Sequence, residues 1–123
     1  MNTLLQLVNL FLFTPAARTA TANGTGVDLQ GYTNPGGRQM KAILTNGTTS
    51  GTSPTLDVKL QDSDDNSTFA DITGATFAQK TAAGNEEIQF RTNKRYVRAV
   101  ATIGGTSPSF TFAVLLLVNK RAV

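Results

Sequence analysis

The chain has 123 residues, of which 40% are hydrophobic, and this size fits one domain with a single core. It contains no cysteine and no histidine, which excludes disulfides, thiolate or imidazole metal ligands, and catalytic triads built on these residues. The net charge is +3, with only 15% charged residues and 11 glycines. This composition is typical of a β-rich chain joined by turns.

The first predicted element is an extended strand over residues 4–13, LLQLVNLFLF. This segment is too short to span a bilayer, and no basic residue precedes it as in a secretory signal peptide. A bare apolar strand at a sheet edge promotes aggregation, so we expect it to be covered within the fold or by a neighbouring subunit. Residues 14–26 are small and polar and predict an extended arm. The predicted organisation is therefore an N-terminal strand and arm, residues 1–22, and a β-sandwich domain, residues 23–123.

Short segments with alternating apolar and polar residues follow along the chain, as in half-buried strands. They are residues 27–32, 38–45, 55–63, 69–72, 73–80, 87–92, 96–103 and 110–120. The segments between them are rich in Gly, Asn, Ser, Thr and Pro, which mark turns. Seven to eight short strands at this spacing predict an all-β fold, an antiparallel sandwich of jelly-roll-like type.

One phrase occurs twice: GTSPTLDVKL begins at Gly51, and GTSPSFTFAV begins at Gly105. Each copy follows an apolar strand and leads into another strand, so each is predicted to form a hairpin. Proline ends each loop, where its fixed φ and missing N–H do least harm. Turn chemistry accounts for every residue of the phrase, so no ligand is assigned to it.

The acidic turn DSDDNS has the first half of a calcium-loop pattern, with candidate ligands Asp62, Asp64 and Asn66. The pattern then departs, because Ser67 stands where that loop needs glycine and Thr73 where it needs a bidentate glutamate. Asp and Asn also build turns by bonding to their own backbone, so an exposed turn without a metal is expected.

The acidic residues lie in predicted turns or on polar strand faces, where solvated carboxylates stay ionised and make poor general acids. The sequence also has no nucleophile-elbow, phosphate-loop or dinucleotide-binding motif. We therefore expect neither catalysis nor a cofactor.

Charge is distributed unevenly along the chain. Residues 28–87 hold all eight acidic residues, whereas residues 88–123 hold six basic residues and no acidic one. The nearby aromatics alternate along strands and are expected in the core, which disfavours nucleic-acid binding. The basic segment is predicted to dock on an acidic protein surface.

The segments NGTGVDLQGY, LDVKLQDSDDNSTFADITGATF and KRYVRAVATIGGTSPSFTFAVLLLVNKR resemble small structural proteins of tailed bacteriophages, in particular capsid decoration or cement proteins. The resemblance covers most of residues 23–121. In related chains the acidic turn usually reads SDDGS, whereas here Asn66 replaces the glycine. Asparagine tolerates a positive φ, so we expect the turn to be retained. The family supplies no catalytic residue.

The resemblance implies a β-sandwich that is made in the host cytoplasm and resides on the exterior of the virion. Its implied partners are the major capsid protein and further copies of itself, as a dimer or trimer, with no nucleic acid and no membrane. The candidate contact residues are Leu4, Leu5, Leu7, Leu10, Phe11, Phe13, Arg18, Arg91, Lys94, Arg95, Arg98, Lys120 and Arg121.

Two other functions fit a β-sandwich. A carbohydrate-binding or adhesion module would use aromatic platforms, but the chain has two tyrosines and no tryptophan. A head-to-tail or tail component would differ from a decoration protein in its copy number per particle.

Overall fold

The computed structural model describes residues 4–30 and 39–122, which form strands and turns and no helix. Seven strands form one antiparallel sheet, which confirms the predicted fold class. They are β1 (Leu4–Arg18), β2 (Ala22–Asn23), β3 (Val27–Asp28), β4 (Gln39–Ser63), β5 (Ala70–Thr76), β6 (Gly84–Arg91) and β7 (Tyr96–Ala122). Part of the strand predicted over residues 27–32, and the turn predicted after it, lie outside the described residues.

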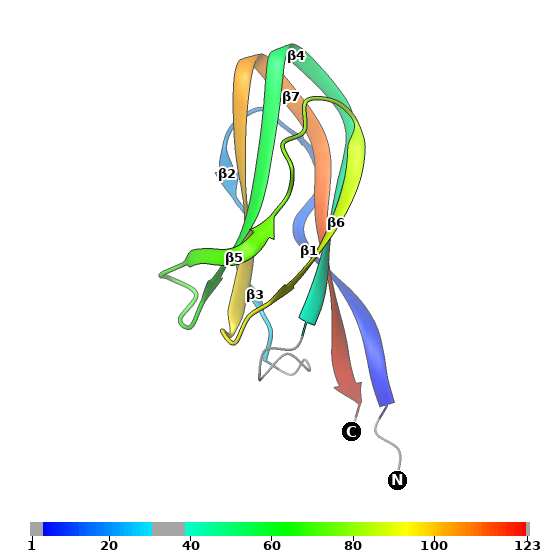
Figure 1. The fold of residues 1–123 in the computed structure, drawn as a ribbon, viewed down its shortest axis with the longest axis vertical. Helices are drawn as coiled ribbons and strands as arrows, with labels where there is room; N and C mark the ends of the chain where they lie inside the picture. Colours follow the sequence, from blue (N-terminus) through cyan, green and yellow to red (C-terminus); the bar gives the residue numbers. More distant parts are fainter. Residues whose placement is uncertain (1–3, 31–38, 123) are drawn as a thin grey trace.

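Two strands are far longer than the short strands predicted: β4 has 25 residues and β7 has 27. They pair with each other from Lys41 opposite Leu117 to Ser63 opposite Tyr96, and they bend together on the way (Figure 1). The bend divides the sheet into two facing layers. The first layer holds β1, β6, the first half of β4 and the second half of β7. The second layer holds β2, β3, β5, the second half of β4 and the first half of β7.

The repeated phrase forms the bend. The sequence predicted two separate hairpins, but β4 and β7 each pass through the bend and pair with one another, with Thr52 opposite Thr106. The contacts are reciprocal. A β-carbon on Gly51 would lie 2.7 Å from the Ser107 carbonyl oxygen, and one on Gly105 would lie 2.7 Å from that of Ser53. The phrase therefore occurs twice because the two strands meet in equivalent conformations at one crossing.

The backbone at this crossing explains the residue types. Gly51 and Gly105 have φ values of +112° and +109°, where side chains with a β-carbon are strained. Ser53 and Ser107 also have positive φ, at 49° and 48°. Three register shifts between Asn46 and Thr55 accompany these conformations. Such irregularities increase the local bend of paired strands, as β-bulges do.

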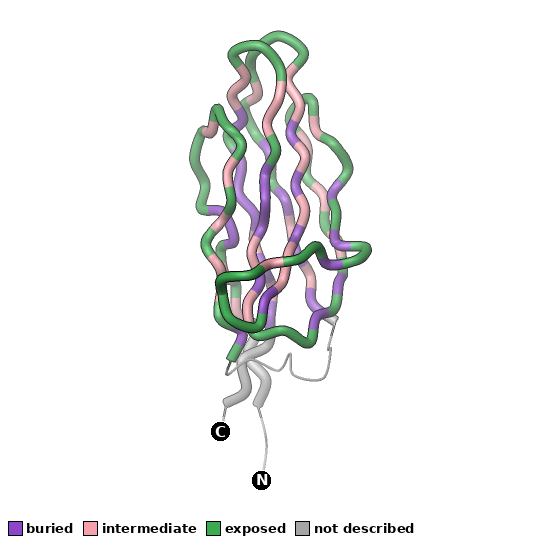
Figure 2. Tube along the Cα trace, turned by 90° about the vertical axis from the view of Figure 1, so that its left-hand side faces the viewer, coloured by how far each residue is buried: buried purple, intermediate pink, exposed green. Residues whose placement is uncertain are grey.

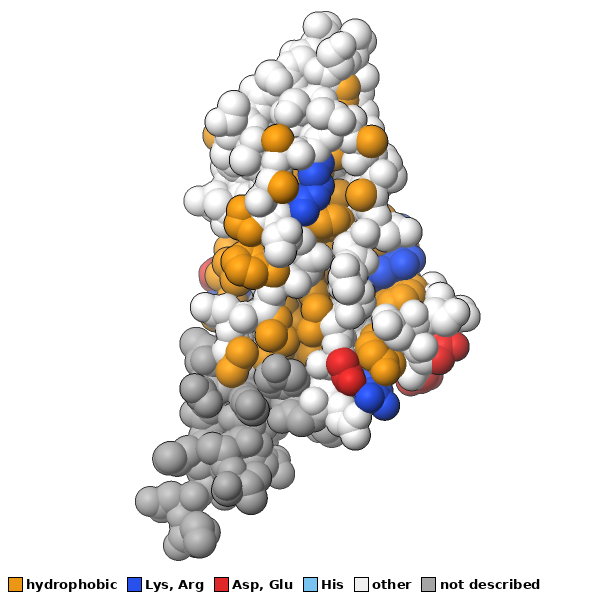
Figure 3. Space-filling model, turned by 180° about the vertical axis from the view of Figure 1, so that it is seen from behind, with side chains coloured by type: hydrophobic (Ala, Val, Ile, Leu, Met, Phe, Trp, Pro, Cys, Tyr) orange, Lys and Arg blue, Asp and Glu red, His pale blue; other side chains and the backbone are white. Residues whose placement is uncertain are grey.

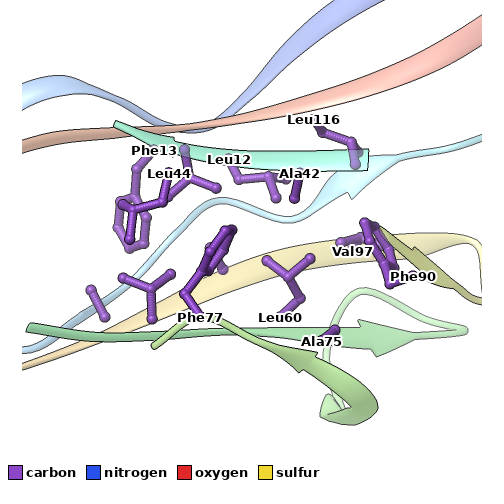
Figure 4. Packing of buried hydrophobic residues seen from close by; sticks show 14 of the residues in the cluster. Leu12, Phe13, Ala42, Leu44, Leu60, Ala75, Phe77, Phe90, Val97 and Leu116 are labelled. Atoms are coloured by element: carbon purple, nitrogen blue, oxygen red, sulfur yellow. The ribbon is translucent and has the colours of Figure 1, made fainter. Parts of the chain in front are cut away.

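The hydrophobic core fills the space between the layers. Ala42, Leu44 and Leu116 of the first layer face Leu60 and Phe77 on the side of the second (Figure 4). The predicted alternation in the second half of β4 is confirmed. Its inward residues Leu56, Val58 and Leu60 are buried. Buried positions run along the middle of the body, and exposed ones cover the bend (Figure 2).

The N-terminal strand pairs within the chain. β1 lies antiparallel to the end of β7, from Leu4 opposite Ala122 to Arg18 opposite Phe110. Leu12 and Phe13 are only 2% and 5% exposed and belong to the same core as the rest of the chain. Of the two arrangements that the sequence left open, the structure has the internal one. The arm then returns along the first half of β7, where the N–H of Gly24 donates to the carbonyl oxygen of Ala99 at 2.7 Å.

The crossing predicts a specific sensitivity to substitution. Gly51→Ala or Gly105→Ala would place a β-carbon against backbone atoms at a positive φ, so each should lower the free energy of unfolding by about 2 kcal/mol. Gly84→Ala is the matched control, because a β-carbon there meets no atom within 4 Å. Urea denaturation at neutral pH measures all three. Equal stability of the three variants would contradict this account of the bend.

Candidate protein-binding surface

A row of apolar side chains lies on the outer face of the first layer. Ile43 of β4 and Phe11 of β1 both pair with Leu115 of β7, so the three residues share one face of the sheet. The neighbours of Ile43 and Leu115 in their strands are buried in the core, which leaves these two on the outside. Leu117, two residues along β7, completes what we call the outer apolar row.

The row is accessible. Phe11 is 46% exposed, and Ile43, Leu115 and Leu117 are half-buried. Hydrophobic side chains gather in the middle of the face seen from behind, whereas the end at the bend is almost free of them and of charge (Figure 3). Lys41 and Glu87 flank the row on one side and form an ion pair of 3.5 Å. An exposed apolar group with a polar border is typical of a protein-binding surface.

Only part of this row could be predicted from the sequence. Phe11 was among the candidate contact residues, but Ile43, Leu115 and Leu117 were not. The available signal was the continuous apolar run AVLLLV at residues 113–118. Such a run indicates a strand with apolar side chains on both faces, whereas a half-exposed strand alternates.

Arg18 lies near one member of this row, Phe11, because both residues line the same pocket. Its guanidinium lies over the rings of Phe13 and Phe112, at 4.8 and 5.0 Å from the ring centroids, and donates to the Phe112 carbonyl oxygen at 3.2 Å. Among the described residues, no carboxylate lies within ion-pair distance of it. A pocket of about 330 Å³ is lined by Arg18 together with residues 11–14 and 22–25. The pocket thus places a fixed positive charge near Phe11, the most exposed member of the row.

Two members of the predicted basic group, Arg95 and Lys94, form ion pairs with carboxylates of the same chain. Arg95 donates through two nitrogens to the carboxylate of Asp28, at 2.9 and 2.8 Å. Lys94 pairs with Asp64 at 2.8 Å. The acidic and basic halves of the sequence therefore fold against each other, which the charge distribution along the chain did not reveal.

Two further members of the basic group differ in their surroundings. Arg98 donates to the side-chain oxygen of Gln61 at 2.9 Å and covers the ring of Phe69 at 4.1 Å. Arg91 is exposed at the end of β6.

The remaining candidate contacts lie on β1 and β7. Leu10 is half-buried against the core, and Phe13 is buried in it, so neither offers a large free surface. Leu4, Leu5 and Leu7 lie in β1, and Lys120 and Arg121 lie opposite Gln6 and Leu5 in β7. The side chains of these last five candidates lie outside what the structure describes.

The acidic turn is built by its own side chains. Asp65 accepts from the backbone N–H groups of Ser67 and Thr68, both at 2.9 Å, and from the Ser63 hydroxyl at 2.8 Å. Asn66 has a φ of 60°, which confirms that it serves in place of the usual glycine.

Two of the three candidate calcium ligands, Asp62 and Asp64, accept hydrogen bonds from residues that follow β6. Asp62 accepts from the Thr92 hydroxyl, and Asp64 accepts from Lys94. Within residues 4–30 and 39–122, no three acidic side chains gather as a metal site would need.

Two carboxyl groups have strongly lowered pKa values. The hydrogen bond from Arg95, followed by the one from the Gln30 N–H, lowers the pKa of Asp28 to about 2. The N–H groups of Thr68 and Ser67 and then the Ser63 hydroxyl lower the pKa of Asp65 to about 2. Both groups are ionised at neutral pH. Their carboxylates accept hydrogen bonds from the neighbouring backbone and side chains, and these bonds hold the loops in place.

No protein-family model matches the sequence, and no curated protein matches it either. Solved structures with a similar fold exist. The chain superposes on the SPBc2 prophage-derived protein YomS with a TM-score of 0.57 and 9% identity, covering 95% of this chain and 97% of YomS. It also aligns with a structure of infectious bursal disease virus, Gx strain, with a TM-score of 0.44 and 12% identity, covering 97% of this chain and 37% of the viral chain. The match to YomS shows a common fold from end to end.

The described residues include no helix of the length and apolarity needed to cross a membrane.

Acid should destabilise the fold through Asp28 and Asp65. Because each folded-state pKa is about 2, below the ordinary 3.8, folding favours the ionised form. The resulting stabilisation is complete above about pH 5 and is lost as the pH falls toward about 2. Asp28→Asn and Asp65→Asn remove the titrating groups, so each variant should lose less stability on acidification than the parent. Urea midpoints measured across this range test the prediction, and identical pH profiles for parent and variants would contradict it.

Proposed function

We propose that this protein is a virion structural protein that binds the outer surface of an assembled phage capsid and stabilises its lattice, as decoration or cement proteins do. The observation that carries the proposal is the outer apolar row, whose exposed member Phe11 lines a pocket together with the fixed charge of Arg18. A surface of this kind fits a partner protein that presents apolar side chains and a carboxylate.

The energetics of such a contact suit a lattice. Burying the exposed part of one side chain such as Phe11 stabilises a contact by about 1 kcal/mol, which is modest for a single site. When copies bind a repeating surface and also bind one another, avidity multiplies weak contacts. An ion pair to Arg18 would add orientation and specificity, because its guanidinium is already fixed by two rings and a carbonyl oxygen.

The fold supports the same proposal. YomS, which shares the architecture over nearly its whole length, derives from a prophage. The proposal also draws on the resemblance of the segments quoted above to phage decoration proteins. A protein in this role needs no catalytic group and no cofactor, and it resides on the exterior of the virion after synthesis in the host cytoplasm.

The proposal predicts a role for Phe11 in capsid binding. Phe11→Asp would place a charge in the apolar contact, at a cost of about 2 kcal/mol, and should reduce the copies bound per particle by roughly tenfold or more. Phe11 is the exposed member of the row, so the variant should fold. Particles of the phage that encodes the chain are purified with each variant, and copies are counted by quantitative mass spectrometry.

Thr106→Asp is the matched control, because it introduces the same charge at an exposed position of the bend. It should leave the copy number unchanged. The parent protein should be present in hundreds of copies, and a dozen or fewer would favour a head-to-tail or tail component. Full occupancy by the Phe11 variant would contradict the role of the outer apolar row.

A further inference from the structure

The two ends of the described chain form a ribbon with only two strands. The pairing of β4 with β7 stops at Lys41 opposite Leu117, but β7 continues to Ala122. Over residues 118–122 its only partner among the described residues is β1, over residues 4–8. This terminal ribbon extends beyond the rest of the sheet (Figure 1). A two-stranded ribbon is marginally stable in water, so a further strand beside it would stabilise it.

The free edge of β1 differs from the other sheet edges of the described chain. β6, the other edge of the first layer, carries Glu86, Glu87 and Arg91 within eight residues. β5, an edge of the second layer, has seven residues, with the charged Asp71 and a glycine, Gly74, at positive φ. Charges and irregularities of this kind keep edge strands from pairing with other chains. Residues 4–13 of β1 carry no charge at all.

We propose that β1 of one copy pairs antiparallel with β1 of a second copy, about a two-fold axis near Leu7. The two terminal ribbons then join into one sheet with the strand order β7-β1-β1-β7. The unpaired N–H and C=O groups of each β1 edge find partners in the other copy. Antiparallel pairing about Leu7 sets Leu4 of one copy opposite Leu10 of the other and brings no charged residues together.

Charge decides between the two edges of the ribbon. Pairing through β7 would bring Lys120 and Arg121 of both copies onto neighbouring strands, and like charges opposite each other destabilise a sheet. Pairing through β1 keeps these residues on the outer strands, about 14 Å apart at the usual strand spacing. That separation exceeds the Debye length of about 8 Å at physiological ionic strength. The β1 edge is therefore the one suited to a second copy of this positively charged chain.

Two-fold symmetry also closes the assembly. Each copy uses its long uncharged edge once. Of the edges that remain, β6 and β5 carry charges, and β2 and β3 have only two residues each, which is too short to pair well with another chain. A head-to-tail arrangement would leave one apolar edge free at each end and would grow without limit. The expected species is a dimer.

Sedimentation velocity of the purified full-length protein at increasing concentration tests the pairing. The parent chain should form a dimer. Leu7→Lys would place two ammonium groups near each other at the axis and should raise the dimer dissociation constant by roughly tenfold or more. Gln89→Lys is the matched control, because it adds the same charge to the exposed part of the β6 edge and should leave the dimer intact. Far-ultraviolet circular dichroism checks that each variant is folded.

A charge-reversal experiment locates the axis. Leu7→Glu should also dissociate the dimer, and an equimolar mixture of Leu7→Lys and Leu7→Glu should restore it, because opposite charges then meet. A monomeric parent, a dimer that survives Leu7→Lys, dissociation by Gln89→Lys, open-ended growth, or a mixture that stays monomeric would each overturn the proposal.

The inference concerns the protein in solution and does not rest on capsid binding. A monomer that still occupies particles would overturn the pairing and leave the proposed function standing. A dimer that never binds particles would do the reverse.

Discussion

The pairing of β4 with β7 is the interaction on which the rest of the structure depends. The two strands stay in contact through the bend, so one continuous ladder of hydrogen bonds belongs to both layers. Each of the other strands pairs with β4 or β7 on one side of the bend. β1 pairs with the second half of β7 and continues to its end. The core forms because the bend brings the inward residues of both layers face to face.

The bend itself depends on two glycines and two serines with positive φ, arranged reciprocally. A conformation of this kind is unfavourable for most residues, so it persists where the surrounding pairing determines it. Here the apolar halves on both sides of the bend supply that pairing. Packing in the core therefore stabilises a local backbone geometry that the phrase alone would populate poorly.

The surface chemistry follows from how the layers bring distant charges together. Asp28 and Arg95 are far apart in sequence but adjacent in the second layer, where the end of β3 meets the start of β7. Such exposed pairs each contribute only modestly to stability, and they neutralise charge at the surface without burying it. The fixed guanidinium of Arg18 and the uncharged edge of β1 stand out against this background, and the proposed contacts use both.

The sequence by itself determined the fold class, the alternation that places Leu56, Val58 and Leu60 inside, and the turn at Asn66. These features depend on side-chain period and on residues that tolerate a positive φ, both of which are local properties. Only the tertiary structure decided that the two Gly-Thr-Ser-Pro phrases pair with each other, that Lys94 and Arg95 meet carboxylates of the same chain, and that Ile43 and Leu115 face outward. Partner choice between strands depends on contacts between residues remote in sequence, and a two-residue period does not record which strand lies alongside.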